Sequence, residues 1–422
     1  MRVFIVGASG FLGRCLLAAL EDAGHDVLCG VRDTARSPCA RCVTVDFTRD
    51  HRIEDWLPRL EGIHAVINCV GILREHGGQT FSALHEEAPR ALFAACAQAG
   101  VDKVIQISAL GADEGARSRY HLSKRRADEF LVSLPVAWTI VRPSLVFGLG
   151  GESARLFTAL ATLPVIPLPG DGEQKVQPIH IDDLTAALVT VVERDDFLRR
   201  HLDAVGPRAI TFRDWIATLR TQLGLPHARF IAIPWRLVRA STEMLSKIPG
   251  VLLDVEALDM LQRGNIAPPD AITRALGRPL RPLEQFIPTS QAPILAAAAR
   301  LRWWLPLLRW SVALVWIATG IISLGIFPLP ESYALLARVG VTGTLAPFAL
   351  YGAAAIDLLF GVGTVLLQRR RWLWRAQIAL VFAYSTVIAI MLPEFWLHPF
   401  GPLLKNVPLI VIIAFLHEFE ER

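Results

Sequence analysis

Short apolar runs alternate with helix-like stretches through the first 150 residues of the chain. The apolar runs have the length and residue types of strands, and they lie at residues 3–6, 27–31, 43–45, 65–69, 103–108 and 138–142. Between them, residues 11–23, 83–99 and 118–133 place apolar side chains every three or four positions, which predicts helices. This alternation predicts an α/β fold built on a doubly wound parallel sheet.

The strand-like runs are apolar throughout, which is typical of strands covered by helices on both faces. After Gly148 the pattern loosens into short helices and proline-rich turns, for example at residues 163–170. Residues 151–290 therefore predict a smaller lobe at the carboxyl edge of the sheet. Open α/β sheets bind their ligands at that edge, so we expect a substrate lobe.

Four long apolar segments follow, at about residues 306–327, 345–367, 376–392 and 402–416. The first two are long enough to cross a bilayer core of about 30 Å at 1.5 Å per residue, and the third is near the lower limit. The fourth is short, and Lys405 and Asn406 interrupt its start. We expect an all-α four-helix transmembrane bundle. Four buried helices of a soluble domain are the alternative, which the lack of a polar face on the first three segments disfavours.

The chain thus divides into a sheet domain at 1–150, the lobe at 151–290, a linker at 291–304 and a membrane domain at 305–422. Composition supports this division, because 53% of the residues are hydrophobic and only 19% are charged. Such a chain is too apolar for an ordinary soluble enzyme, and the excess lies in the last part. The lipid bilayer is therefore an expected partner, while nothing in the sequence indicates the oligomeric state.

Arginines concentrate beside the apolar segments. Arg300, Arg302 and Arg309 lie at the first segment, and residues 369–371 with Arg375 separate the second from the third. The positive-inside rule puts both arginine groups on the cytoplasmic side. We therefore expect the sheet domain and the C-terminus on that side as well, as in a four-span protein of the bacterial inner membrane. The net charge of +4, without a basic face carrying aromatic residues, argues against nucleic acid as a partner.

All six cysteines fall in the first 96 residues. Cys39 and Cys42 form a lone CxxC with no second pair, so we expect no metal site. Reduced thiols fit a cytosolic location. The first residues run directly into a strand, so we expect no signal peptide, and the targeting information lies in the apolar segments.

Three glycines at three-residue spacing follow the first strand. Gly7 permits a tight turn, Gly10 lets backbone approach a pyrophosphate, and Gly13 lets the following helix pack on the strand. The start of that helix offers free N–H groups to phosphates. The turn therefore predicts a nucleotide site in a Rossmann domain, and the residues between the glycines that share it are Ala8, Ser9, Phe11 and Leu12.

The end of the second strand selects the nucleotide. Arg32 and Arg36 favour the extra phosphate of NADP(H). Asp33 keeps NAD(H) open, because a carboxylate turned inward would accept a ribose hydroxyl. After the third strand, Asp46 and Phe47 suit the edge and face of an adenine.

These residues resemble the extended or atypical branch of the short-chain dehydrogenase/reductase superfamily, over about residues 1–285. Ser108 and the Tyr120-x-x-x-Lys124 motif are similar to the catalytic set of that family. The resemblance implies cofactor contacts at Lys124 and in the segments 68–71 and 141–148, namely at Cys69, Val70, Gly71 and Pro143. Residues 178–183 are similar to the family's substrate-lobe motif.

Residues 84–90 and 108–112 resemble the atypical members, which include the dehydrogenase-like accessory subunit of respiratory complex I. That subunit type holds NADPH without a known turnover role. Residues 398–408 resemble the DoxX-like membrane family, over about residues 305–420, and some relatives there are tied to quinone-linked chemistry.

Tyr120 and Lys124 share one face of the predicted helix at four-residue spacing. A cation beside a phenol lowers its pKa, and such a tyrosine can pass a proton to a carbonyl oxygen held by Ser108. The alternative is a surface tyrosine and a solvated lysine, among the arginines at positions 117, 119, 125 and 126.

Two further groups of polar residues have alternative interpretations. His180, Asp182 and Asp183 either face substrate or cap a helix and tie the lobe to the sheet. Asp357 lies within the second apolar segment, where a charged residue usually marks a buried polar site. Near the start of the fourth segment, His398, Lys405 and Asn406 could contact Asp357, or they could contact a lipid headgroup or a quinone. Snorkelling of Lys405 to the membrane surface is the alternative.

Two functions therefore stay open. One is a membrane-anchored NADP(H) oxidoreductase that acts on a lipophilic carbonyl or a quinone-like molecule. The other is a non-catalytic, nucleotide-holding structural or assembly module of a membrane complex.

Overall fold

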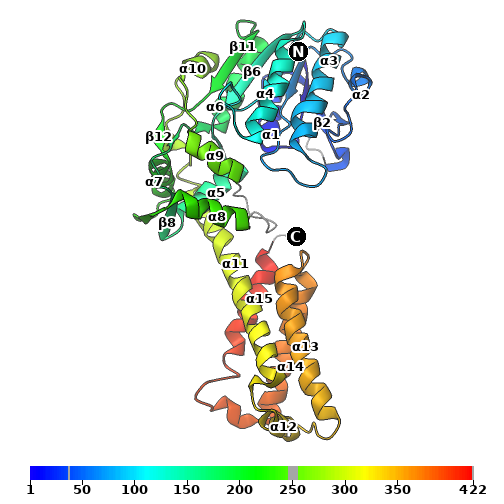
Figure 1. Cartoon of the computed structure of the whole chain (residues 1–422), viewed down its shortest axis with the longest axis vertical. Helices are drawn as coiled ribbons and strands as arrows, with labels where there is room; N and C mark the ends of the chain where they lie inside the picture. Colours follow the sequence, from blue (N-terminus) through cyan, green and yellow to red (C-terminus); the bar gives the residue numbers. More distant parts are fainter. Residues whose placement is uncertain (37–38, 246–254, 421–422) are drawn as a thin grey trace. The chain divides into compact units, whose positions relative to one another are not determined.

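The computed structural model describes residues 1–36, 39–245 and 255–420, and the chain divides into two units, Met1–Ala297 and Ala298–Arg422. Seven strands form the central sheet of the first unit in the order β11-β6-β5-β4-β1-β2-β3, and every neighbouring pair is parallel (Figure 1). The strands are β1 (Arg2–Val6), β2 (Asp26–Val31), β3 (Cys42–Thr44), β4 (Ala65–Asn68), β5 (Lys103–Ile107), β6 (Ala137–Pro143) and β11 (Arg200–Ala204). The doubly wound parallel sheet predicted from the sequence is confirmed.

Strand β11 is absent from the sequence prediction, because its residues RHLDA carry few apolar side chains. It pairs with β6 along its whole length, from Arg200 opposite Thr139 to Ala204 opposite Pro143. An edge strand is buried less completely than a central strand, so its sequence carries a weaker pattern of apolar residues.

Helices cover both faces of the sheet. Leu16, Leu184 and Ile272 pack one face, and they come from α1 (Phe11–Asp22), α6 (Ile181–Glu193) and α10 (Asp270–Leu276). Trp56 and Leu92 pack the other face, which is covered by α2 (Ile53–Trp56), α3 (Ala88–Ala99) and α4 (Arg119–Val132). The helix expected over residues 83–99 begins as a wider turn at Ser82–Glu87, and Pro89 then opens the regular helix α3.

The lobe has its own small core beside the carboxyl edge of the sheet. The Trp215 ring lies 5.4 Å from Phe147 and 5.7 Å from Phe286, centroid to centroid. Its strand pairs are β7 (Val146–Phe147) with β10 (Ile179–His180), β9 (Lys175–Val176) with β12 (Ile210–Thr211), and β8 (Val165–Pro169) with β13 (Arg229–Ile233). Its helices are α5 (Glu152–Ala161), α7 (Phe212–Gln222), α8 (Trp235–Leu245) and α9 (Val255–Arg263).

The segment expected to be a linker is helical. Residues 292–304 form the first part of α11 (Ala292–Ile321), and the buried Ala292 and Ala296 pack in the core of the lobe. Four consecutive alanines at 296–299 favour a helix over an irregular connection. The expected linker at 291–304 is thus helical, and the boundary between the two units, after Ala297, lies within it.

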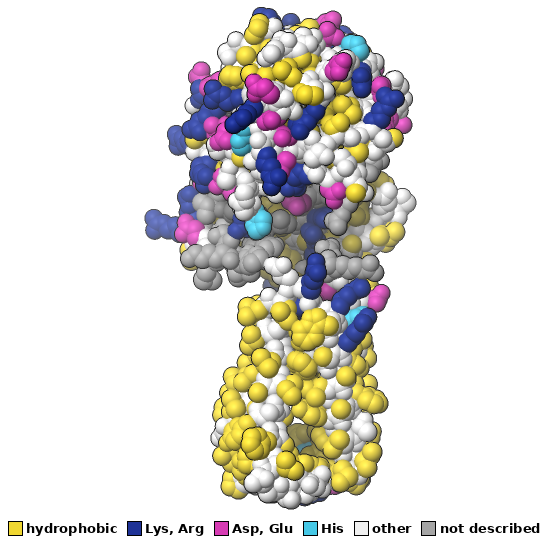
Figure 2. All heavy atoms as spheres, turned by 90° about the vertical axis from the view of Figure 1, so that its right-hand side faces the viewer, with side chains coloured by type: hydrophobic (Ala, Val, Ile, Leu, Met, Phe, Trp, Pro, Cys, Tyr) yellow, Lys and Arg dark blue, Asp and Glu magenta, His cyan; other side chains and the backbone are white. Residues whose placement is uncertain are grey.

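The second unit is all helical (Figure 1). It continues α11 and adds α12 (Leu329–Arg338), α13 (Leu345–Leu366), α14 (Arg371–Met391) and α15 (Asn406–Phe419). Among the described residues, three helices are long and apolar enough to cross a membrane, namely Ala292–Ile326, Leu345–Leu366 and Arg371–Met391, while α15 is shorter. Figure 2 shows a surface of this unit that is largely hydrophobic, and exposed Phe348, Leu359 and Phe382 contribute to such a surface.

Polar contacts hold the helices of the second unit in register. Gln377 of α14 is fully buried, accepts from Trp316 Nε1 of α11 at 3.0 Å, and donates to Thr364 Oγ1 of α13 at 2.8 Å. At one end of the unit, Glu420 lies 2.8 Å from Arg309 and 3.4 Å from Arg370. Arg309, the loop after α13 and the end of α15 thus meet at the same end of the unit.

Candidate active site

The glycine turn has the geometry of a phosphate site. Gly7 has a φ of +82°, and Gly10 N–H donates to the Gly7 carbonyl at 3.0 Å. A Cβ on Gly13 would lie 2.2 Å from that same carbonyl oxygen, so a larger residue does not fit. Gly10 ends the turn and caps α1 without a side-chain hydrogen bond, which leaves the first N–H groups of the helix free for an anion. The residues present therefore fit a dinucleotide.

The end of β2 supplies a cation beside this turn. Arg32 is exposed, directly after Val31. Asp33 Oδ1 accepts from Ala35 N–H at 3.0 Å, so its carboxylate is turned toward its own chain. Arg36 ends the short turn Thr34–Arg36, and its side chain lies outside the described part of the protein. The sequence left open whether the Asp33 carboxylate turns inward toward a ribose hydroxyl. In the structure it turns toward Ala35, so Arg32 is available at the end of β2 for a phosphate.

Asp46 and Phe47 follow β3 but differ in their surroundings. Asp46 accepts from the Thr48 N–H at 3.0 Å and from its hydroxyl at 2.7 Å. Burial opposes the charged form, yet these bonds and the nearby arginines at 49 and 32 hold the pKa of Asp46 below its ordinary value. Phe47 is 4% exposed and its ring meets Trp56 edge-on at 5.5 Å. Phe47 is therefore a core residue here, and Asp46 is the more accessible of the two.

The loop after β4 is held by buried polar side chains. Asn68 Oδ1 accepts from Val70 N–H at 3.1 Å, and Asn68 Nδ2 donates to Gln106 at 2.8 Å. His85 Nε2 accepts from Ile72 N–H at 3.1 Å. These bonds hold the loop in place directly after β4, at Cys69, Val70 and Gly71. The loop lies close to the glycine turn, because a Cβ on Gly7 would come within 3.0 Å of the Cys69 carbonyl carbon. The turn and the loop are thus adjacent, as a shared cofactor site requires.

Lys124 joins this loop to the end of β5. Lys124 is 3% exposed, and its Nζ donates to the carbonyls of Val70 and Ile107, both at 3.1 Å. Burial lowers the pKa of Lys124 to about 8, against the opposing effects of Asp128 and Cys69. Ser108 follows Ile107 directly, so Lys124 and Ser108 meet at one edge of the sheet. Pro143, at the end of β6, accepts from Leu110 N–H at 2.9 Å and lies beside them.

Tyr120 lies in the first turn of α4, between aromatic neighbours. Its ring is edge-on to His85 at 5.5 Å and to Phe81 at 6.0 Å. No described residue forms a hydrogen bond with its hydroxyl. Burial, reinforced by Asp128, raises the pKa of Tyr120 to about 12. The sequence predicted a lowered pKa from the nearby lysine, and the structure differs because the Lys124 cation faces two carbonyls.

Two residues of this site were missed in the sequence. His85 Nδ1 lies 2.9 Å from Ser123 Oγ, which donates to the Tyr120 carbonyl at 2.8 Å, so His85 connects the loop after β4 to the start of α4. Burial, and then the Lys124 charge, lowers the pKa of His85 to about 2, which keeps it neutral. Asp128 accepts from Ser108 at 2.5 Å. Its position eight residues after Tyr120 on one helix face was the only available signal.

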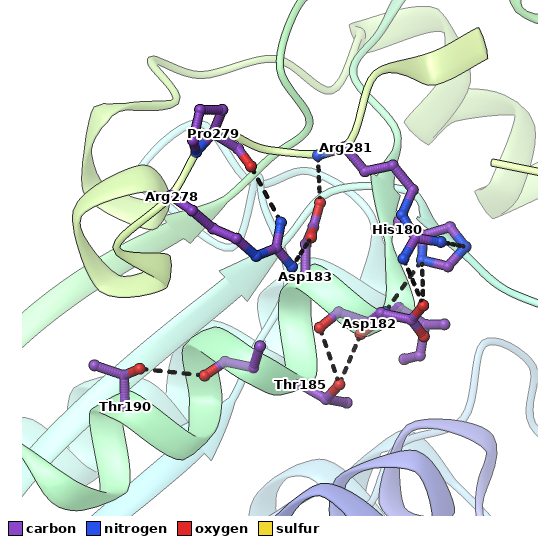
Figure 3. A network of polar contacts seen from close by, with 10 residues as sticks. His180, Asp182, Asp183, Thr185, Thr190, Arg278, Pro279 and Arg281 are labelled. Atoms are coloured by element: carbon purple, nitrogen blue, oxygen red, sulfur yellow. Dashed lines mark hydrogen bonds and ion pairs between the residues drawn. The ribbon is translucent and has the colours of Figure 1, made fainter. Parts of the chain in front are cut away.

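The substrate-lobe motif ties the lobe to the sheet domain (Figure 3). His180 caps α6 by accepting from Asp182 N–H at 3.2 Å, and it also lies 3.2 Å from Arg281. Asp183 is 1% exposed and binds Arg278 and the Arg281 N–H, both at 2.7 Å. These contacts match the capping and tying alternative, with His180 as the cap.

The polar residues of the membrane unit lie at separate places. Asp357 is 9% exposed, and its Oδ1 has no hydrogen-bond partner among the described residues, while Thr319 and Tyr384 lie near it. Asn406 donates to Ser385 at 2.8 Å, and His398 Nδ1 accepts from Phe400 N–H at 3.3 Å. No described contact joins Asp357 to His398, Lys405 or Asn406.

Family comparisons identify both units. Residues 3–202 match the NAD dependent epimerase/dehydratase family, and residues 313–414 match the DoxX-like family. The first unit therefore carries an epimerase/dehydratase-like, NAD(P)-binding Rossmann domain, and the second carries a DoxX-like domain. The resemblances drawn from the sequence are confirmed.

Curated relatives cover the first unit. The chain is 27% identical over 263 residues to the mitochondrial NADH dehydrogenase (ubiquinone) 1 alpha subcomplex subunit 9 of Arabidopsis thaliana, covering 58% of this chain and 64% of that protein. It is 33% identical over 190 residues to ceramide reductase of Caulobacter vibrioides, covering 44% and 59%. The chain therefore spans less than two thirds of the length of these relatives.

Solved structures share the fold. A nucleoside-diphosphate-sugar epimerase from Staphylococcus aureus matches with a TM-score of 0.57 at 14% identity, over 68% of this chain and 99% of that one. An NADPH-dependent quinone oxidoreductase from Escherichia coli matches with a TM-score of 0.54 at 17% identity, over 67% and 97%. At these identities the likeness shows the Rossmann fold alone.

Proposed function

We propose that this protein is a membrane-anchored, NADP(H)-dependent reductase of a lipophilic carbonyl or quinone-like substrate. The observation that carries the proposal is the convergence of the glycine turn, the Lys124 ammonium and Ser108 at one edge of the sheet, with Tyr120 at the start of the adjacent helix. The chain joins this site to a strongly apolar helical unit, so the substrate is expected to be one that concentrates in a bilayer.

The turn residues Gly7 to Gly13 would hold the pyrophosphate on the free N–H groups of α1, and Arg32 would hold the 2′-phosphate of NADP(H). The bound nucleotide supplies a hydride. Lys124 lies between the loops that follow β4 and β5, where its ammonium would hold the nicotinamide ribose. Its two carbonyl contacts keep the ammonium in place and leave its third N–H free.

Tyr120 would supply the proton to the substrate oxygen. Its raised pKa keeps the hydroxyl protonated at neutral pH, as a proton donor requires, and no described residue occupies that hydroxyl. Ser108 would bind the same oxygen by a hydrogen bond. A proton donor of this kind contributes about 10²–10⁴-fold in rate.

The names of relatives support the substrate class. One is a ceramide reductase, which points to a lipid as a substrate for this kind of domain. The lobe would form the pocket, and residues 178–183 would hold it against the sheet. The membrane unit would keep the pocket close to a bilayer, with the sheet domain on the cytoplasmic side where NADPH is made.

A second candidate function has its own support. Other relatives are a subunit of mitochondrial NADH dehydrogenase and a photosystem II assembly factor of Synechocystis. A chain of that kind would hold NADP(H) to stabilise its fold and would serve a membrane complex as a structural module.

Turnover separates the two functions. The full chain, purified in detergent, is supplied with NADPH and a panel of quinones and long-chain keto lipids, and absorbance reports NADPH oxidation. We expect turnover that Tyr120→Phe lowers by roughly 10²–10⁴-fold, with NADPH affinity little changed because the turn and Arg32 bind the nucleotide. Ser133→Ala, an exposed residue at the far end of α4, is the control. NADPH binding without turnover on any substrate would instead support the structural module.

A further inference from the structure

Asp128 lies behind the proposed catalytic residues, one helical turn after Lys124. It is 2% exposed, and its Oδ2 accepts from Ser108 Oγ at 2.5 Å. Its Oδ1 is buried without a hydrogen-bond partner among the described residues. An unpartnered oxygen is costly to bury on a carboxylate and much less costly on a neutral carboxyl group. Deep burial thus favours a proton on Asp128, while Gln106, whose own Nε2 is also without a partner among the described residues, favours the charged form.

Charged and polar side chains from several elements influence the protonation of Asp128. Lys124 and Tyr120 face it from its own helix, Arg142 faces it from β6, and the uncharged Gln106 and Ser108 face it from β5 and its end. Burial raises the pKa of Asp128 to about 7, although Ser108, Lys124, Arg142 and Gln106 each oppose the rise. Farther out, Asp203 and Asp113 lie near Arg142 and offset its charge.

The hydroxyl of Ser108 has a single proton to donate. When Asp128 is a carboxylate, which only accepts, that proton is directed to Oδ2, and Ser108 presents lone pairs to a bound substrate. When Asp128 is protonated, its O–H donates to Ser108 Oγ, and the Ser108 proton turns to the substrate. A carbonyl oxygen needs a donor, whereas the hydroxyl of the product alcohol needs an acceptor.

We propose that Asp128 is a positioning residue whose protonation sets the direction of the Ser108 hydroxyl, and thereby favours carbonyl reduction when protonated and alcohol oxidation when charged. The inference rests on the proposed function. Asp128 gives no proton to the substrate; only the hydrogen bonds between Asp128, Ser108 and the substrate oxygen reverse. The site is therefore a pH-dependent selector of reaction direction.

The pH dependence of kcat tests this role with Asp128→Asn. An asparagine has a permanent donor for Ser108, and its carbonyl oxygen can accept from the unpartnered Gln106 Nε2. We expect wild-type kcat for reduction to fall up to tenfold per pH unit above about pH 7, and kcat for oxidation to rise over the same range. Asp128→Asn should remove both changes. Glu129→Gln, at an exposed carboxylate of the same helix that pairs with Arg125 at 2.6 Å, should keep the wild-type profile.

Titration of Lys124 would appear in the KM for NADPH rather than in kcat, since its expected contact is the ribose. A profile in which Asp128→Asn keeps the wild-type midpoint in kcat would overturn the proposal.

A second measurement is independent of turnover. The infrared difference between wild type and Asp128→Asn, on the full chain in detergent, should show a protonated carboxyl band at pH 5.5 that falls to half near pH 7 and is lost at higher pH. Absence of that band at pH 5.5 would overturn the inference whether or not the protein is an enzyme. A titrating band in a protein without turnover would instead contradict only the proposed function.

Discussion

At the scale of single residues, the proposed selectivity of the nucleotide site depends on Arg32, an exposed cation directly after β2. Asp33 is turned toward the N–H of Ala35, so in the proposed site Arg32 would meet the group that distinguishes NADPH from NADH. The guanidinium matches a phosphate in geometry as well as in charge.

Arg32→Asp should therefore reverse the preference between the two nucleotides. A hydrogen bond to a charged group contributes about 1.5–3 kcal/mol, so NADPH should bind roughly 10- to 100-fold more weakly, while NADH binding is maintained or improved. Calorimetric titration of the full chain measures both affinities. Arg194→Asp has the same charge change at an exposed position near the opposite edge of the sheet and should leave them unchanged. Tighter binding of NADH than NADPH by the wild type would refute the NADP(H) assignment.

At the scale of elements, α11 and α13 approach closely through glycines. A Cβ on Gly361 of α13 would lie 2.5 Å from Ile317 Cγ1 and 3.0 Å from the Ile317 nitrogen, and a Cβ on Gly320 would lie 3.0 Å from the Ala354 carbonyl oxygen. Small residues let the backbones of membrane helices come together, because lipid provides no hydrophobic driving force between them.

The same helix offers a matched pair of substitutions. Gly361→Ala must separate α11 from α13 and should destabilise the unit by about 1–3 kcal/mol. Gly352→Ala meets nothing within 4 Å and should be neutral or stabilising, because alanine favours a helix over glycine by about 1 kcal/mol. Unfolding in detergent followed by circular dichroism compares them. Equal stability of the two variants would mean that this helix contact does not exist.

At the scale of the whole molecule, the charged end of the helical unit constrains its topology. Arg309, Arg370 and Glu420 are joined by ion pairs, so the start of the first apolar segment, the loop between the second and third, and the end of α15 lie at one end of the unit. The positive-inside rule assigns that end to the cytoplasm.

We therefore expect the chain to cross the membrane an even number of times. Reporter fusions at Gly340 and after Arg422 should report opposite compartments, with the latter cytoplasmic. The 14-residue α15 is short for a span, so this experiment also decides whether it crosses. The same compartment at both positions would mean that α15 does not cross and that four spans are wrong.

The sequence by itself determined the sheet, the glycine turn and the apolar helices. Each depends on local signals: the alternation of apolar runs with amphipathic stretches, glycine at positions where a Cβ has no room, and continuous apolar length. The turn Gly7 to Gly13 and the strands β1 to β6 could be predicted for this reason. The helical form of the linker was not predicted, because local irregularity near Pro288 concealed the helix propensity of the alanines that follow.

Only the tertiary structure decided how the site residues are used. The pattern Tyr120-x-x-x-Lys124 indicates a shared helix face, but the partners of Lys124 are carbonyls from two other strand ends. The neighbours of Asp128 come from α4, β5 and β6, which are far apart in the sequence. Burial and charge at a site depend on distances between such segments, and the pKa values of Tyr120, Lys124 and Asp128 follow from those distances and not from the residue order.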